Sequence, residues 1–183
     1  MISNTTLRNI INFLAFEGMW FLCVLRADLV AAGLTLAAVG LHLLFISQNR
    51  IVEGRFIIMA AVLGVGLDTL WQNLGVLRFP ENDGAYAEGL IPGWLMTIWL
   101  AFATTLGHSL AWIRRHRYLP WLFAPIAGPF AYWGAATLGP VEIGYGYSGL
   151  LALALGWALV FPLQLRILAW LEHTQGPIDA NPS

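Results

Sequence analysis

The sequence predicts an all-α fold, a polytopic membrane helical bundle of about six transmembrane helices with both termini in the cytoplasm. The chain is 58% hydrophobic and only 10% charged, which is typical of a protein that lies largely in lipid. Its apolar residues form six long runs. These runs lack the alternation that a β-barrel needs, so helices are the structures that satisfy their backbone groups in lipid.

A helix needs roughly 20 apolar residues to cross the hydrocarbon core. The six runs that approach this length are residues 8–25, 29–47, 55–78, 91–113, 119–138 and 147–171. The first run follows Arg8 without a small-x-small cleavage site, so it is interpreted as a retained span and not as a signal peptide. The fifth run contains Pro125 and Pro129, which remove hydrogen bonds from a helix and predict either a simple kink or a stretch that lines a cavity.

We expect residues 1–175 to form a single transmembrane helical domain. Residues 176–183, rich in Pro, Gly and Asn, are expected to form a short disordered cytoplasmic tail.

The orientation follows from the arginines, since the chain has no lysine. Alternating spans place seven of the nine arginines on one side, with Arg114, Arg115 and Arg117 together after the fourth span. Acidic residues lie in the connections on the other side of the membrane: Asp28, Glu81, Asp83, Glu88 and Glu142. The expected location is therefore the bacterial cytoplasmic (inner) membrane, crossed several times. A net charge of −1 and the absence of a basic face exclude nucleic acid as a partner.

Two carboxylates interrupt apolar runs, Glu17 in the first span and Asp68 in the third. An ionisable group at such a depth is costly and commonly marks a ligand site or a pathway. Trp71 and Gln72 follow Asp68 at three- and four-residue spacing and so share its helix face. We expect these side chains to converge on an interior site near the middle of the bilayer. The alternative is that they only join helices through hydrogen bonds.

Histidines form a second layer, nearer the cytoplasmic side. His108, with Thr104 one turn before it, is the functional candidate, whereas His42 is interpreted as a structural residue near the interface. No metal site and no cofactor are expected, because no paired histidine spacing occurs within one helix and the histidines lie a turn or more from Glu17 and Asp68. The single Cys23 excludes an internal disulfide. Tyr132, in the fifth span, completes the predicted site.

Several segments resemble an uncharacterised family of short multi-span bacterial inner-membrane proteins, a domain of unknown function. The similarity is carried mainly by residues 99–112, WLAFATTLGHSLAW, with Glu17 and Trp20, Gly66-Leu67-Asp68, and Gly128-Pro129. The resemblance implies a multi-span membrane protein of no settled activity. It also implies that the gene lies near genes for fatty-acid modification, which favours a lipid-like partner.

The sequence thus predicts a protein that binds or transports a lipid-like or small amphiphilic molecule. The residues predicted to bind this ligand are Glu17, Asp68, Trp71, Gln72, Thr104, His108 and Tyr132. Two alternatives stay open. One is a membrane-embedded, lipid-modifying enzyme with His108 and Asp68 as acid and base. The other is a structural subunit that joins a membrane-protein partner.

Overall fold

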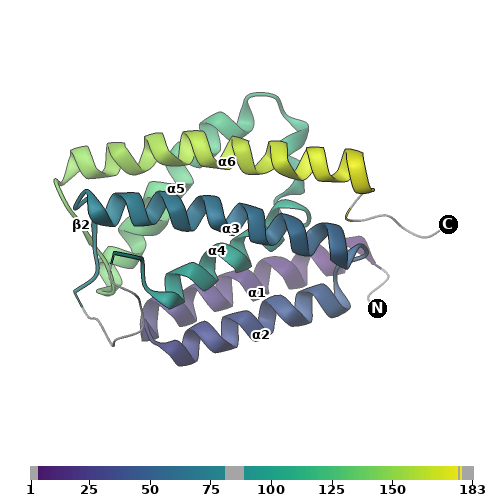
Figure 1. The fold of residues 1–183 in the computed structure, drawn as a ribbon, viewed down its shortest axis with the longest axis horizontal. Helices are drawn as coiled ribbons and strands as arrows, with labels where there is room; N and C mark the ends of the chain where they lie inside the picture. Colours follow the sequence, from purple (N-terminus) through teal and green to yellow (C-terminus); the bar gives the residue numbers. More distant parts are fainter. Residues whose placement is uncertain (1–3, 81–88, 177, 179–183) are drawn as a thin grey trace.

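The computed structural model describes residues 4–80, 89–176 and 178 (Figure 1). Its elements in chain order are α1 (Thr5–Arg26), α2 (Leu29–Phe45), α3 (Arg50–Asn73), β1 (Leu77–Arg78), α4 (Gly93–Leu106), the 3-10 helix η1 (Ala111–Arg115), α5 (Leu119–Leu138), β2 (Glu142–Ile143) and α6 (Tyr147–Gln175). The all-α prediction is confirmed: six α-helices lie in the described part of the chain, in the order of the six apolar runs.

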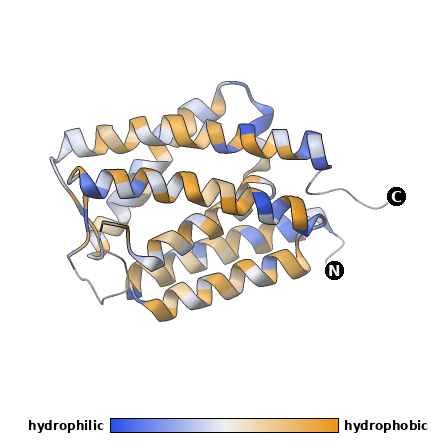
Figure 2. Cartoon of the chain, viewed as in Figure 1, coloured by the Kyte–Doolittle hydropathy of each residue, from blue (hydrophilic) through white to orange (hydrophobic). Residues whose placement is uncertain are grey.

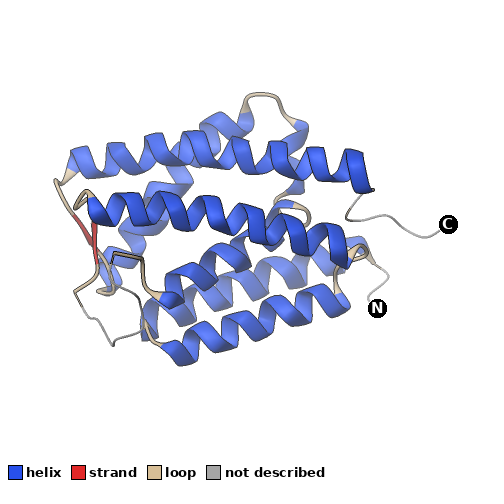
Figure 3. Cartoon of the chain, viewed as in Figure 1, coloured by secondary structure: helices blue, strands red, loops and turns tan. Residues whose placement is uncertain are grey.

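The six helices form a bundle in which successive helices run in alternating directions, so that both ends of the chain lie at the same end of the bundle (Figure 1). α4 is at the centre, packed against α1, α2 and α3, and most of its side chains are buried. α6 packs against α3 and α5. At the end of the bundle opposite the termini, β1 and β2 form a two-stranded antiparallel pair with Leu77 opposite Ile143 (Figure 3).

Side chains at the helix ends explain where several helices begin. Asn4, Asp28 and Asn49 cap α1, α2 and α3, and each accepts hydrogen bonds from backbone N–H groups of the first turn. The Asn49 cap starts α3 at Arg50, five residues before the predicted start of the third span. This earlier start brings Glu53 into the first turn of a helix.

The fourth run does not form one helix to residue 113, as the sequence analysis expected. α4 ends at Leu106, and a tight turn follows in which the N–H groups of His108 and Leu110 both donate to the Thr105 carbonyl. The chain then continues as η1. His108 therefore lies in a turn between two helices.

The two prolines of the fifth run do not end the helix. α5 continues as a single helix through Pro125 and Pro129 and ends at Gly139, whose φ of 104° favours glycine.

Two residues of the tail expected to be disordered are described, Gly176 and Ile178. Ile178 is 1% exposed, and its carbonyl accepts a hydrogen bond from the Asn49 N–H at 3.1 Å. Residues 177 and 179–183 of that tail, and the acidic residues Glu81, Asp83 and Glu88, lie outside the described residues.

By length and hydropathy, two of the described helices could cross a membrane, α1 and α6. α2 and α4 are apolar but shorter. Apolar residues cover the middle of the helices, whereas hydrophilic residues gather toward the two ends of the bundle (Figure 2).

Candidate functional site

Asp68 is fully buried and joins three helices. Its Oδ2 atom accepts hydrogen bonds from Trp99 Nε1 at 2.6 Å and from the Tyr132 hydroxyl at 2.5 Å. These donors come from α4 and α5, while Asp68 itself is on α3. Its other oxygen, Oδ1, has no partner among the described residues.

Glycines hold the donor Trp99 in place. A Cβ atom at Gly64 would lie 2.1 Å from the Trp99 ring, so only glycine lets the indole pack against α3. On its other side Trp99 stacks on Trp157, with ring centroids 5.0 Å apart. Trp157 in turn packs against Gly128, where an added Cβ would lie 2.2 Å from its ring. The aromatic rings therefore fill spaces that small residues leave between the helices.

Next to this cluster is a cavity of about 550 Å³, bounded by α1, α4, α5 and α6. Its wall is largely aromatic and includes Trp20, Trp99, Phe102, Trp157 and Phe161. Glu17 and Tyr132 are among its few polar wall residues. Some wall residues are also exposed at the protein surface, namely Phe13, Phe21 and Phe130, so the cavity opens sideways.

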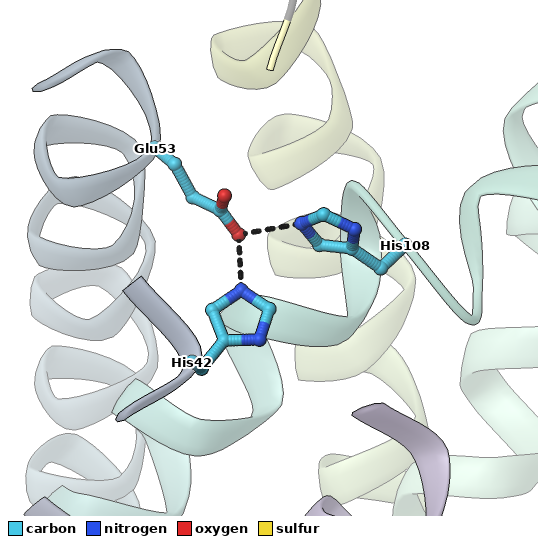
Figure 4. Close-up of side chains that lie close together, drawn as sticks. All are labelled: His42, Glu53 and His108. Atoms are coloured by element: carbon cyan, nitrogen blue, oxygen red, sulfur yellow. Dashed lines mark hydrogen bonds and ion pairs between the residues drawn. The ribbon is translucent and has the colours of Figure 1, made fainter. Parts of the chain in front are cut away.

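A second polar cluster lies toward the end of the bundle that holds both termini. Glu53 Oε1 accepts hydrogen bonds from His42 Nε2 at 2.6 Å and from His108 Nε2 at 2.9 Å (Figure 4). The two imidazole rings are 4.8 Å apart at an angle of 80°. Glu53 and His108 are each 1% exposed and His42 is 6% exposed. The carboxylate is thus enclosed by two imidazoles, and its Oε2 atom has no partner in the described part of the protein.

Asn12 on α1 connects this cluster to its surroundings. Its Oδ1 atom accepts from the Ser109 hydroxyl at 2.6 Å and from the Ser109 N–H at 3.3 Å. Its Nδ2 atom donates to Thr104 Oγ1 at 3.0 Å and lies 3.4 Å from His42 Nδ1. Because the Ser109 N–H can only donate, the amide oxygen must face it, and the Asn12 N–H groups then face His42. His42 Nδ1 consequently accepts, and its Nε2–H donates to Glu53.

The residues predicted to form one site fall into two groups. Asp68 and Tyr132 are in direct contact, and Glu17 lies on the wall of the same cavity as Tyr132. Thr104 belongs with Asn12, and His108 with Glu53.

Trp71 and Gln72 belong to neither group. Trp71 Nε1 packs near Gly156, and Gln72 Oε1 is buried without a partner among the described residues.

Sequence reasoning missed Glu53, because the predicted spans ended at residue 47 and resumed at residue 55. The available signal was the pair Asn49 and Glu53, a helix-capping residue followed by an acidic residue in the first turn. His42 had been interpreted as structural, and its pairing with His108 through Glu53 was not expected. The sequence analysis also did not anticipate that His42, Glu53 and His108 each place a ligand atom within 4.8 Å of the others.

A family model described as "Protein of unknown function (DUF2878)" matches residues 9–163. The chain belongs to this family. Neither the search of curated proteins nor the search of solved structures found a match. The part matched by the DUF2878 model contains both polar clusters and the wall of the large cavity. The resemblance to an uncharacterised family is confirmed, and membership of the DUF2878 family assigns no activity.

Proposed function

We propose that this member of the DUF2878 family is a multi-pass membrane protein that binds a lipid-like or small amphiphilic molecule in the 550 Å³ cavity. The observation that carries the proposal is the chemistry of the cavity: an aromatic wall, a lateral opening, and a carboxylate from Glu17 on the same wall.

The protein surface supports location in a membrane. Large apolar side chains are exposed on the outer faces of the helices, among them Ile126 at 72%, Leu159 at 69% and Val62 at 66%. Large exposed apolar surfaces of this kind mark a face that contacts a membrane or another apolar partner. Hydrophilic residues gather toward the two ends of the bundle (Figure 2). We therefore infer that all six helices cross the bilayer, including those shorter than 18 residues.

The arrangement of arginines supports an orientation with both termini in the cytoplasm of a bacterium. Arg114 and Arg115 are on η1, at the end of the bundle that holds the termini, and Arg114 forms an ion pair with Glu172 at 2.6 Å. The positive-inside rule places this end in the cytoplasm. The His42–Glu53–His108 cluster then lies toward the inner side of the membrane.

The cavity wall defines the class of ligand. Ligand pockets in proteins are mostly apolar, with a few polar groups that orient the ligand. Here aromatic faces suit an acyl or isoprenoid chain. Glu17 makes no hydrogen bond to a described residue, so its carboxyl group is available to accept from a hydroxyl or amine at the polar end of the ligand. The lateral opening lets such a molecule enter from the hydrocarbon core.

The proposal is tested by filling the cavity. Ala131→Phe places a ring inside it, since Ala131 is on its wall. The probe is a pyrene-labelled long-chain alcohol, which accepts excitation energy from the tryptophans of the wall when it binds to the purified protein in nanodiscs. We expect Ala131→Phe to weaken binding by on the order of tenfold, because the ring occupies space that the chain of the probe would fill.

The matched control is Ala37→Phe, the same substitution at an exposed position of α2 outside the cavity. It should bind the probe as the wild type does. Equal binding by the wild type and Ala131→Phe, with both proteins folded, would exclude this cavity as the ligand site.

A further inference from the structure

We propose that His42, Glu53 and His108 bind a divalent first-row transition metal ion, such as zinc or iron(II). This inference is independent of amphiphile binding, since none of the three residues lines the large cavity. It rests on the type of donor atoms, their spacing, their burial and a second cavity that reaches His42.

The donor atoms form a recognised set. Two imidazole nitrogens and one carboxylate oxygen bind catalytic zinc in one class of enzyme and iron(II) in another, and both sites keep open positions for water or substrate. The three residues come from the last turn of α2, the first turn of α3 and the turn after α4 (Figure 4). Because helix packing fixes these segments, the donors stay close together without a ligand.

The spacing requires little change on metal binding. In a tetrahedral zinc site, bonds of roughly 2.0–2.1 Å place two donor atoms about 3.3 Å apart. The Glu53 Oε1 atom lies 2.6 Å from His42 Nε2 and 2.9 Å from His108 Nε2, and all ligand atoms fall within 4.8 Å. Side-chain shifts of under about 1 Å would admit an ion at these bond lengths.

Burial favours an ion over an empty site. Glu53 Oε2 is enclosed and has no hydrogen-bond partner among the described residues. An unsatisfied carboxylate oxygen at such a position is costly. A bound cation would balance the charge of the Glu53 carboxylate, by contact with Oε1 alone or with both carboxylate oxygens.

A second cavity, of about 270 Å³, reaches one residue of the site. It lies between α1, α2 and α4, and its wall includes His42, Asn12 and Thr104. The cavity therefore reaches the His42 imidazole, whereas Glu53 and His108 are not on its wall.

Asn12 determines which ring nitrogen of His42 carries the proton, and this gives a specific test. A metal on Nε2 moves the ring proton of His42 to Nδ1, where it meets the Asn12 amide nitrogen at 3.4 Å. Metal-bound histidines normally donate this proton to an oxygen. Asn12 must therefore turn its oxygen toward His42 on metal binding, which breaks its bond with the Ser109 N–H. Asp at this position would offer an oxygen to both partners.

The experiment uses the full-length protein purified in detergent. Its metal content is measured by inductively coupled plasma mass spectrometry, and Co²⁺ is titrated with detection of its visible absorption. We expect about one equivalent of metal per wild-type chain, and none after Glu53→Gln, which lacks the anionic ligand. The control His116→Gln changes an exposed histidine outside the cluster and should bind as the wild type does.

The Asn12→Asp variant keeps all three ligands and should bind Co²⁺ more tightly, by on the order of 10-fold, because a carboxylate orients and strengthens His42 as a ligand. It also provides a result if Glu53→Gln does not fold. A folded wild type that takes up no Co²⁺, or weaker binding by Asn12→Asp than by the wild type, would overturn the proposal.

Discussion

The Tyr132 hydroxyl donates a 2.5 Å hydrogen bond to Asp68 and so joins α5 to α3 across the wall of the large cavity. Both residues are buried. Trp99 donates to the same carboxylate oxygen, which means that the wall of the cavity is held by a polar contact among three helices. A change in this contact should affect stability and the cavity together.

Tyr132→Phe removes one of the two donors to Asp68 and keeps the ring. We expect a loss of about 1–3 kcal/mol in stability, because a buried carboxylate oxygen loses one of its two hydrogen bonds. Thermal unfolding in detergent measures this as a lower midpoint temperature. The control is Tyr147→Phe, since the Tyr147 side chain is 92% exposed. Equal midpoints for the two variants would show that the contact does not hold the helices together.

Gly64→Ala tests the packing that places Trp99. An added Cβ would lie within 2.1 Å to 2.5 Å of three atoms of the Trp99 ring, and the stacked ring of Trp157 limits how far the indole can move away. We expect destabilisation of about 3 kcal/mol or more. Gly66→Ala, two residues further along the same helix, has open space around its Cβ and should be neutral or slightly stabilising. Unfolding midpoints of the two variants provide the comparison, and similar midpoints would contradict the packing.

The sequence could predict the helices, because their number and order follow from apolar run length. It could not predict where two of them begin and end. α3 begins at Arg50 because Asn49 caps it, and α4 ends at Leu106 because the Thr105 carbonyl accepts from the turn that follows. These two boundaries place Glu53 and His108 beside each other. Hydropathy does not detect either boundary, since caps and turns depend on single polar groups.

The site was predicted from depth in the membrane, which gives a level along a helix but not the direction in which a side chain points. Asp68 and Tyr132 proved to be in contact, whereas Trp71 and Gln72, one turn further along α3, do not line the cavity. Glu17 is on the cavity wall, whereas Asp68 is not and is bound instead to Trp99 and Tyr132, which are. Pairing of this kind depends on tertiary packing, which a single sequence does not reveal.

Ile178→Ala tests the ordered end of the chain. Ile178 is buried, and a Cβ at Gly107 would lie 3.3 Å from its Cδ1 atom, so its side chain covers the turn that carries His108. Removing most of this buried side chain should weaken docking of the segment by about 2–5 kcal/mol. We expect faster digestion by carboxypeptidase than in the wild type. Leu159→Ala, at a position 69% exposed, should leave the rate unchanged. An unchanged rate for Ile178→Ala would show that the segment is not docked in solution.

A cysteine-labelling experiment tests whether α5 crosses the membrane, which its length and hydropathy alone do not establish. His116→Cys and Tyr147→Cys place thiols before and after α5, both at exposed positions. In right-side-out vesicles, a membrane-impermeant maleimide should label Tyr147→Cys but not His116→Cys, because the proposed orientation puts the arginines around residue 116 in the cytoplasm. Inverted vesicles should give the opposite result.

The native Cys23 is fully buried, so the parent chain should react only after denaturation and serves as the control. Labelling of both thiols from the same side would show that α5 does not span the bilayer, and the bundle would then have fewer crossings than the six proposed.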